Sequence, residues 1–212
     1  MVTILLADDH AVMREGLRAL LETQPDFQVV GVAANGRQAV RKTQELCPSI
    51  VLMDIAMPDL NGIEATRQIR EICPDARVVI LSMYATSEYV YRAFQAGALG
   101  YLLKESAGAE VVQAIQAVSL GMTYISQKIQ PMLGKEFARQ KKSPLERLSP
   151  REREVLQLTV EGNSSLQIAE TLSLSPKSVD TYRSRIMAKL EIHDTASLVK
   201  FAVRHGLTSL ES

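Results

Sequence analysis

Short apolar runs alternate with segments of helical period over roughly the first 120 residues of the chain. The apolar runs predict five β-strands, at 2–7, 27–33, 49–53, 77–81 and 98–102. The segments between and after them predict helices at 11–23, 36–46, 60–71, 86–96 and 106–119. Because the strands are continuously apolar rather than alternating, helices should cover both faces of the sheet. The pattern therefore predicts a parallel α/β domain over residues 1–121.

The pattern changes over residues 122–146, where Pro131, Gly134 and Pro144 interrupt any helical period. We interpret this segment as a linker that contains one short helix. No strand pattern follows it, and four helix-start signals appear instead. They are Ser149 before Pro150, Ser164 with Gln167 three residues later, Ser175 before Pro176, and Asp194. Residues 147–212 are thus predicted to form a small all-α domain of four helices.

Composition and charge separate the two parts only mildly. The 212 residues carry 24 basic and 24 acidic side chains, and 46% are hydrophobic, which excludes a disordered chain, a collagen-like fibre and a coiled-coil rod. Residues 1–140 hold 13 basic and 15 acidic groups, whereas residues 141–212 hold 11 and 9. Within the second part, the window 176–204 has six basic groups against three acidic ones. This asymmetry indicates different roles for the two domains.

The chain is expected to be a cytoplasmic protein without a membrane partner. No apolar stretch reaches the ~18 residues that a membrane span needs, and the N-terminus lacks the pattern of a secretory signal. Cys47 and Cys73 lie far apart in the sequence and provide neither a disulfide framework nor a zinc spacing, which favours a reducing compartment. Each cysteine precedes a proline at the end of a predicted helix, and we interpret both as buried packing residues.

Polar residues follow four of the five predicted strands. They are Asp8 and Asp9 after the first, Asp54 after the third, Ser82 after the fourth and Lys104 after the fifth. In an open parallel sheet, ligands bind outside the carboxyl ends of the strands, so these side chains should meet at one edge. Three crowded carboxylates repel unless one is protonated or a cation lies among them, and Mg²⁺ suits such an oxygen-rich site. Lys104 and the Ser82 hydroxyl would then serve a phosphoryl oxygen beside the metal.

Each of these residues alone has an ordinary structural interpretation. A single aspartate at a strand end is usually a helix cap or a turn former, and a single serine or lysine there is commonly structural. The combination over four strands is what indicates a site. His10 could be a general base, but at the start of the first helix beside two aspartates we interpret it as a surface neighbour of the site.

The motifs at these positions resemble the receiver domains of two-component response regulators over residues 1–120. The motifs are Ala7-Asp8-Asp9-His10, Met53-Asp54-Ile55-Ala56-Met57-Pro58 with Asn61-Gly62, Ser82, and Gly100-Tyr101-Leu102-Leu103-Lys104. The resemblance implies a flavodoxin-like, doubly wound sheet with strand order 2-1-3-4-5. It also implies that Asp54 accepts a phosphoryl group from a sensor histidine kinase or a phosphotransfer protein.

The same resemblance assigns roles to the surrounding residues. Asp8, Asp9, Asp54 and the backbone carbonyl of Ala56 would hold Mg²⁺, and Lys104 would pair with the phosphoryl group. Ser82 and Tyr101 would form a switch, in which the hydroxyl moves to the phosphate and the aromatic ring turns inward. One departure is Glu105, because receivers often have proline after the lysine.

In the C-terminal third, helices predicted at 164–172 and 176–190 are separated by a three-residue turn, which is helix-turn-helix geometry. The second helix has a predicted buried stripe of Val179, Tyr182, Ile186 and Leu190. Its opposite stripe consists of Asp180, Thr181, Ser184 and Ala188, flanked by Lys177, Arg183, Arg185 and Lys189. Small and polar residues suit a helix that enters a DNA groove, and the basic residues would meet phosphates. From spacing alone, a solvated face of a helical bundle is equally compatible.

Asp180 is the residue least expected at a DNA surface. In one interpretation it pairs with Lys177 and Arg183 on its own helix. In another, its carboxylate accepts a hydrogen bond from cytosine in the major groove. We favour the first, with the charge still opposing non-cognate DNA.

Residues 148–207 resemble the LuxR-type helix-turn-helix domain of the NarL/FixJ family. The matching motifs are Pro150-Arg151-Glu152-Arg153-Glu154-Val155-Leu156, Ile168-Ala169, Ser175-Pro176-Lys177-Ser178-Val179 and Lys189-Leu190. The family implies a four-helix module that binds promoter DNA as a homodimer, with the last helix at the contact between the two copies. Ser165-Leu166-Gln167 and Asp180 depart from the family pattern in ways that concern sequence preference rather than fold.

The resulting hypothesis is a response regulator that acts as a transcription factor. It is not expected to be an enzyme beyond the chemistry of its own phosphoryl group. An aspartate-nucleophile phosphohydrolase is one rival, but such enzymes carry a second aspartate where this chain has Ala56. A second rival is a regulator whose helical module binds protein or acts without phosphorylation.

Overall fold

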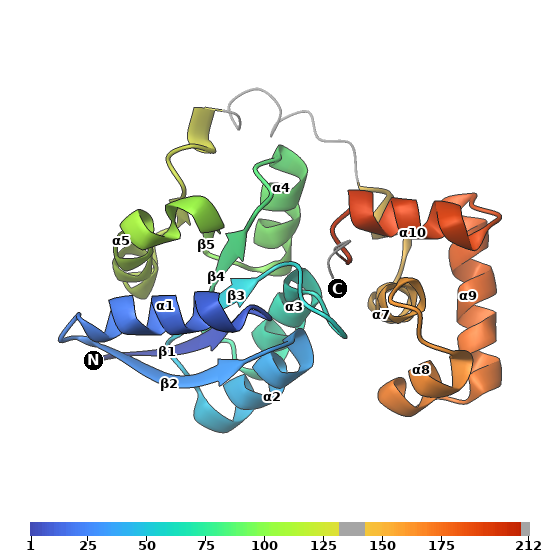
Figure 1. The fold of residues 1–212 in the computed structure, drawn as a ribbon, viewed down its shortest axis with the longest axis horizontal. Helices are drawn as coiled ribbons and strands as arrows, with labels where there is room; N and C mark the ends of the chain where they lie inside the picture. The colour runs from blue at the N-terminus through green and yellow to red at the C-terminus, as the bar shows by residue number, and fades with distance from the viewer. Residues whose placement is uncertain (132–142, 209–212) are drawn as a thin grey trace. The chain divides into compact units, whose positions relative to one another are not determined.

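The computed structural model describes residues 1–131 and 143–208, which form two compact units (Figure 1). The N-terminal unit contains a fully parallel sheet with strand order β2-β1-β3-β4-β5-β6. The strands are β1 (Val2–Ala7), β2 (Phe27–Ala33), β3 (Ile50–Asp54), β4 (Arg77–Ser82), β5 (Gly100–Leu103) and β6 (Tyr124–Ile125). The predicted order of the first five strands is confirmed, and the sheet has six strands rather than the five expected.

Helices cover both faces of this sheet, as the continuously apolar strands predict. They are α1 (Ala11–Glu22), α2 (Gly36–Leu46), α3 (Gly62–Ile72), α4 (Ser87–Ala96) and α5 (Ala107–Ser119), with a 3-10 turn, η1 (Lys104–Ser106), before the last. One hydrophobic core joins α1 and α5 to the sheet through residues such as Leu21, Val111 and Ile115. On the opposite face α2 packs against α3, and α3 packs against α4. The sheet is therefore rigidly sandwiched, which fixes the ends of its strands.

The sixth strand lies in the segment expected to be linker. Its backbone pairs with β5, and Glu110 of α5 holds the same segment through its carboxylate. That carboxylate accepts hydrogen bonds from Tyr124 Oη (3.2 Å), Ser126 Oγ (3.0 Å) and the backbone N–H of Gln127 (3.3 Å). The N-terminal unit thus extends beyond residue 121. Residues 132–142, in the middle of the expected linker, lie outside the described residues.

The interpretation of both cysteines as buried packing residues is wrong. Cys47 is exposed and Cys73 is partly exposed. Each forms the C-cap of a helix, and its backbone N–H closes the last turn by donating to Thr43 O or Ile69 O. The ends of these surface helices lie in solvent, so the cysteine side chains do too.

The C-terminal unit is all helical, as predicted. Its elements are η3 (Pro144–Arg147), α7 (Pro150–Val160), α8 (Ser165–Leu172), α9 (Pro176–Leu190) and α10 (Thr195–Arg204). The four predicted caps are confirmed, because Ser149, Ser164, Ser175 and Asp194 each accept a backbone N–H three residues on. Leu145 of η3 already belongs to the core of this unit. Within the described residues, no helix combines the length and hydropathy that a membrane crossing requires.

Candidate functional site

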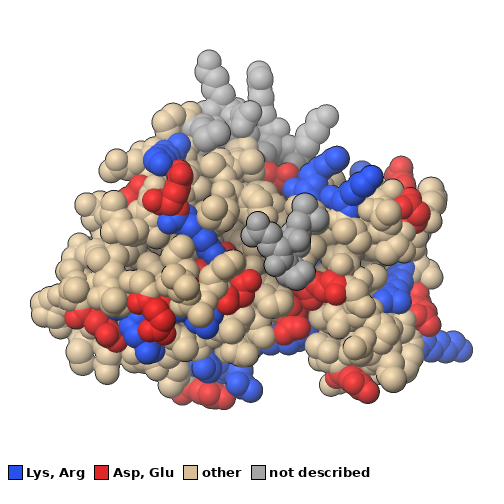
Figure 2. Space-filling view, in the orientation of Figure 1, with Lys and Arg blue, Asp and Glu red and all other residues tan. Residues whose placement is uncertain are grey.

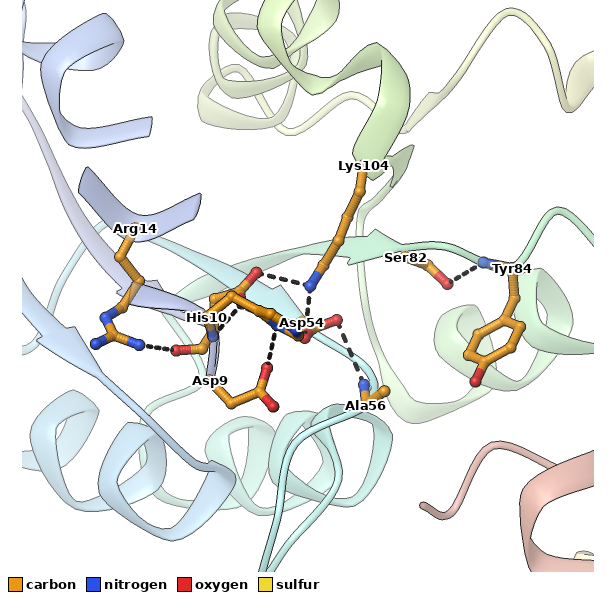
Figure 3. Close-up of polar contacts among 9 residues, drawn as sticks. Asp9, His10, Arg14, Asp54, Ala56, Ser82, Tyr84 and Lys104 are labelled. Atoms are coloured by element: carbon orange, nitrogen blue, oxygen red, sulfur yellow. Dashed lines mark hydrogen bonds and ion pairs between the residues drawn. The ribbon is translucent and has the colours of Figure 1, made fainter. Parts of the chain in front are cut away.

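The carboxyl edge of the sheet brings Asp8, Asp54 and Lys104 together. Figure 3 shows Lys104 and Asp54 pointing toward one another. Asp8 follows β1, Asp54 ends β3 and Lys104 follows β5, so the side chains converge from three strands at the same edge of the sheet. Lys104 Nζ lies 2.7 Å from Asp54 Oδ2 and 2.9 Å from Asp8 Oδ2. Both carboxylates are almost fully buried, with only 2% of each side chain exposed. The lysine therefore bridges two buried carboxylates.

The turn after Asp54 is shaped by Asn61 and Gly62. The Asn61 side chain caps α3 by accepting the backbone N–H groups of Ile63 and Glu64 at 3.1 and 3.0 Å. Gly62 N donates to Ile55 O at 2.9 Å, which folds the start of α3 back onto the end of β3. A Cβ added at Gly62 would lie 1.9 Å from the carbonyl oxygen of Asp54. Glycine is therefore required by close backbone approach, and this contact fixes the backbone of Asp54.

The charges at this edge are strongly coupled. Burial raises the pKa of Asp54 to about 6, with Asp8 and Asp9 adding to the rise and Lys104 opposing it. Burial by itself would lower the pKa of Lys104, but the neighbouring Asp54 and Asp8 carboxylates raise it. Near neutral pH the site therefore holds a charged lysine and a mostly ionised Asp54, whose carboxylate retains nucleophilic oxygen atoms.

Asp9 and His10 complete the acidic edge. His10 Nδ1 lies 2.7 Å from Asp9 Oδ1 and 3.3 Å from Asp8 Oδ1, and the His10 backbone N–H donates to Asp8 Oδ1 at 2.8 Å. Donor atoms of Asp8, Asp9, His10 and Asp54 all lie within 4.8 Å of one another. The imidazole is 61% exposed, as expected for a surface neighbour. These atoms could hold a metal ion.

Two further backbone groups face the site. The Ala56 N–H donates to Asp54 Oδ1 at 3.3 Å, so the residue predicted to offer its carbonyl also contacts the acidic side chain. Arg14, which the sequence patterns did not indicate, donates from Nη1 to the carbonyl oxygen of Asp8 at 2.5 Å. A single arginine on an amphipathic helix gives no signal for such a contact.

Ser82 and Tyr101 both contact the backbone of Tyr84, another residue that sequence reasoning missed. Ser82 Oγ accepts the Tyr84 N–H at 2.9 Å, and Tyr101 Oη donates to the Tyr84 carbonyl at 2.7 Å. Tyr101 is fully buried, so its ring already points inward. The Tyr84 ring stacks on Tyr89 of α4, with ring centroids 4.4 Å apart. The loop after β4 thus connects the site edge with α4.

The peptide bond between Lys104 and Glu105 is trans, because the structure contains no cis peptide bond among its described residues. Glu105 turns to the surface, where Lys128 Nζ lies 2.9 Å from its Oε1. Glutamate in place of the more common proline therefore leaves Lys104 in contact with both carboxylates.

In the C-terminal unit, α9 follows α8 after the short turn that helix-turn-helix geometry requires. Val179 and Ile186 are buried, and Tyr182 and Leu190 pack against the same core, so the predicted stripe is confirmed. Lys177 and Arg185 are exposed. The hydroxyls of Thr181 and Ser184, also exposed, donate to the carbonyls of Lys177 and Asp180 on their own helix.

Three residues of α9 have partners inside the unit that the sequence did not indicate. Lys189 Nζ lies 2.7 Å from Glu152 Oε2 of the α7 capping box. Asp180 Oδ1 accepts the Ser165 hydroxyl at 2.7 Å, so its observed partner is on α8 rather than on its own helix. Arg183 donates to Ser165, Asn163 and Thr159, three residues at the junction of α7 and α8. These contacts join α9 to the helices before it.

Charged side chains are intermixed over the visible surface. Figure 2 shows lysine and arginine next to aspartate and glutamate on this face, in line with the equal totals of the two charge types. Any nucleic-acid interface must therefore depend on local arrangement, such as that on α9, rather than on net charge.

Comparison with known proteins identifies both units. The profile described as the response regulator receiver domain matches residues 4–116, and that of the bacterial regulatory proteins of the luxR family matches residues 146–202. The transcriptional regulatory protein LiaR of Bacillus subtilis is 39% identical over 99% of this chain and 100% of its own length. The response regulator UvrY of Escherichia coli K12 is 38% identical over 100% of this chain and 98% of its own length.

A solved structure agrees with these matches. The crystal structure of a LuxR-family two-component response regulator from Aurantimonas sp. SI85-9A1 is 42% identical, with a TM-score of 0.62, and covers 65% of this chain and 99% of its own. A receiver fold with an acidic edge, joined to a helix-turn-helix unit, defines a two-component response regulator. This chain belongs to the response regulators with a LuxR-type helix-turn-helix domain, which are transcription regulators.

Proposed function

We propose that Asp54 is the phosphoacceptor of this response regulator and that a sensor histidine kinase or a phosphotransfer protein is the donor. An Asp54 carboxylate oxygen attacks the phosphorus atom of a phosphohistidine. The new P–O bond forms as the P–N bond breaks, and the imidazole leaving group takes up a proton. The observation that carries the proposal is the buried Asp54 carboxylate in direct contact with Lys104. A buried, partly ionised carboxylate beside a fixed cation is suited to accept a phosphoryl group.

The neighbours of Asp54 have defined tasks in this reaction. Lys104 leaves Asp54 Oδ2 to pair with a phosphoryl oxygen, which is a charge-assisted contact of the same kind. The Ala56 N–H, now 3.3 Å from Asp54 Oδ1, is available as a backbone donor to the same group. Ser82 Oγ accepts the Tyr84 N–H, and its hydroxyl also interacts with the Tyr101 side chain. Rotation of this hydroxyl would direct its proton to a phosphoryl oxygen.

The donor set suits Mg²⁺. Oxygens of Asp8, Asp9 and Asp54 lie within 4.8 Å of one another, and hard oxygen ligands are those that Mg²⁺ prefers. Asp8, Asp9, Asp54 and the carbonyl oxygen of Ala56 would hold the ion. Its chemistry there is neutralisation of negative charge on the carboxylates and the phosphoryl oxygens. His10, although near these oxygens, is exposed and is assigned no role in the reaction.

The output passes through Ser82, Tyr84 and Tyr101. When the Ser82 hydroxyl turns to the phosphoryl group, it weakens its bond with the Tyr84 N–H. The carbonyl of the same Tyr84 holds the Tyr101 hydroxyl, so both switch residues act on one peptide segment. Movement of this segment changes the surface next to α4 and thereby favours a homodimer.

The C-terminal unit binds double-stranded promoter DNA through α9, as a homodimer. The exposed Lys177 and Arg185 neutralise phosphates, and the Thr181 and Ser184 side chains face the groove. Lys189, held by Glu152, and Asp180, held by Ser165, border the same surface. A mobility shift with a promoter fragment tests this proposal and separates it from a helical module that binds protein.

The phosphoacceptor is tested with a small-molecule acyl phosphate, Mg²⁺ and intact-mass measurement. Wild-type protein should gain one phosphoryl group, and a chelator should prevent the gain. Asp54→Asn should gain none, whereas Asp26→Asn, which alters an exposed aspartate far along the sequence, should behave as wild type. Full phosphorylation of Asp54→Asn would exclude Asp54 as the acceptor.

A further inference from the structure

Cys47 and Cys73 occupy equivalent places in two successive helix-to-strand connections. Cys47 ends α2 just before β3, and Cys73 ends α3 just before β4. β3 and β4 are parallel neighbours with Ile50 paired to Arg77. The backbone N–H of Arg77 donates to the carbonyl of Ser49 at 3.0 Å, so hydrogen bonding between the two connections begins two residues after Cys47. The strand register therefore places the two connections side by side.

Packing of the preceding helices completes the juxtaposition. α2 lies against α3 on the same face of the sheet, and both cysteine backbones are fixed because each closes the last turn of its helix. The Cys47 side chain lies near enough to influence the Cys73 thiol. Cys47 is exposed and Cys73 is partly exposed, so small reagents in solution can reach the pair. Two accessible thiols at neighbouring helix ends are placed to react with one another.

We propose that Cys47 and Cys73 form a redox-sensitive dithiol that is oxidised to an intramolecular disulfide by low-molecular-weight disulfides. The Cys47 thiolate attacks a small disulfide, forming a mixed disulfide and releasing one small thiolate. Cys73 Sγ then attacks the Cys47 sulfur, closing the protein disulfide and releasing a second small thiolate. Two protein thiols lose two electrons and two protons, and one small disulfide becomes two thiols.

The order of attack follows from the environments of the sulfurs. Burial raises the pKa of the Cys73 thiol, and the neighbouring Cys47 thiol adds to the increase. The more exposed Cys47 is therefore the first to react with a reagent in solution, and Cys73 resolves the mixed disulfide. In a reducing cytoplasm such a pair stays reduced and responds only when the disulfide pool rises.

The disulfide would enclose the segment that carries Asp54, Asn61 and Gly62. The cysteines lie before the amino ends of β3 and β4, whereas Asp54 lies at the carboxyl end, so the bond forms at the opposite edge of the sheet. Closing a loop of roughly 25 residues should raise the melting temperature on the order of 10 °C. Phosphorylation of Asp54 should be unaffected.

The full-length protein is incubated with oxidised glutathione under native conditions, and free thiols are then alkylated and the intact mass is measured. Wild-type protein should lose both thiols together without keeping a glutathione adduct, and dithiothreitol should restore them. Cys47→Ser and Cys73→Ser serve as matched controls, and each should retain a single glutathione adduct because it lacks the resolving partner. Peptide mapping should recover the Cys47 and Cys73 peptides joined.

Three results would overturn the proposal. The first is that both thiols stay fully alkylatable at a large excess of oxidised glutathione. The second is that wild-type protein accumulates two stable glutathione adducts, and the third is that it forms only disulfide-linked dimers. Each shows that the two sulfurs do not reach one another in solution.

Discussion

Arg183 provides a sharp test of how α9 is held for DNA binding. Its guanidinium donates from Nε to Thr159 Oγ1 (3.1 Å), from Nη1 to Ser165 Oγ (2.9 Å) and from Nη2 to the carbonyl of Asn163 (2.8 Å). The Ser165 hydroxyl in turn donates to Asp180 Oδ1. The sequence predicts Arg183 as a phosphate contact, but all these partners lie within its own unit. We therefore expect Arg183 to position α9 rather than to neutralise a phosphate.

The magnitude follows from these three bonds. Arg183→Met keeps much of the aliphatic packing but removes every donor, leaving three acceptors at the junction of α7 and α8. Loss of a charged hydrogen-bonding partner typically destabilises a protein by about 1–3 kcal/mol, and solvent access lowers this cost for a half-buried side chain such as Arg183. We expect the C-terminal unit to lose about 2 kcal/mol of unfolding free energy.

DNA binding separates the two roles through its dependence on salt. A side chain that neutralises a phosphate contributes about 0.9 to the slope of log K against log salt concentration. Arg183→Met should weaken binding without changing this slope. Arg185→Met, on the exposed side of the same helix, is the matched control, and it should lower the slope by about 0.9 with little change in stability.

The measurement combines fluorescence anisotropy on a labelled promoter fragment, over about 50–200 mM salt, with urea unfolding followed by circular dichroism. A slope that falls by about 0.9 in Arg183→Met, together with unchanged stability, would refute the positioning role and support the phosphate contact. Absence of DNA binding by wild-type protein would instead contradict the proposed function itself.

Three further outcomes are expected. Gly62→Ala should destabilise the N-terminal unit by several kcal/mol in urea unfolding and slow phosphorylation, because its Cβ would meet the Asp54 carbonyl. Since burial raises the pKa of Asp54 from 3.8 to about 6, the ionised carboxylate costs stability above that range. In metal-free buffer, wild-type stability should fall as pH rises from 4 to 7, and Asp54→Asn should gain about 2–3 kcal/mol at pH 8 but nothing below pH 3.8. Burial would raise the pKa of Glu152, but contacts with Lys189 and Ser149 lower it. The ionised carboxylate therefore adds to the free energy of unfolding, and this contribution should be lost as pH falls below 4.5. Acid unfolding followed by circular dichroism should show the loss in wild-type protein and not in Glu152→Gln.

The strands and most of the site could be predicted from the sequence because their causes are local or topological. A continuously apolar run forms a buried strand wherever helices cover both faces, and serine before proline starts a helix in any context. The convergence of Asp8, Asp54 and Lys104 can also be predicted from the topology of the sheet alone, because the carboxyl ends of parallel strands meet at one edge. Residue type and strand order together were enough to locate these three.

The features that could not be predicted depend on contacts between distant segments. β6 has two residues, too few to show any period, and it is held by Glu110. The spacing of α9 places Arg183 beside the buried stripe, which makes it the least certain of the predicted phosphate contacts. It does not reveal the partners of Arg183, because only the fold brings Ser165 and Asn163 within reach. The proximity of the two helix ends that carry Cys47 and Cys73 likewise depends on the register of β3 and β4, which the sequence does not specify.

At the acidic edge, the carboxylate that lowers the stability of the fold is also the group proposed to react. Burying Asp54 beside Asp8 raises the free energy of its carboxylate, which is why its pKa lies near 6 rather than near 4. Lys104 relieves part of this energy by contacting both carboxylates, and the Gly62 contact keeps the Asp54 backbone from moving away. A phosphoryl group on Asp54 would convert one carboxylate oxygen into the bridging oxygen of an acyl phosphate and place the negative charge on the phosphoryl oxygens. Lys104 would then have to leave at least one of its present partners, and that rearrangement is the physical means by which a single bond at Asp54 can alter the Tyr84 segment.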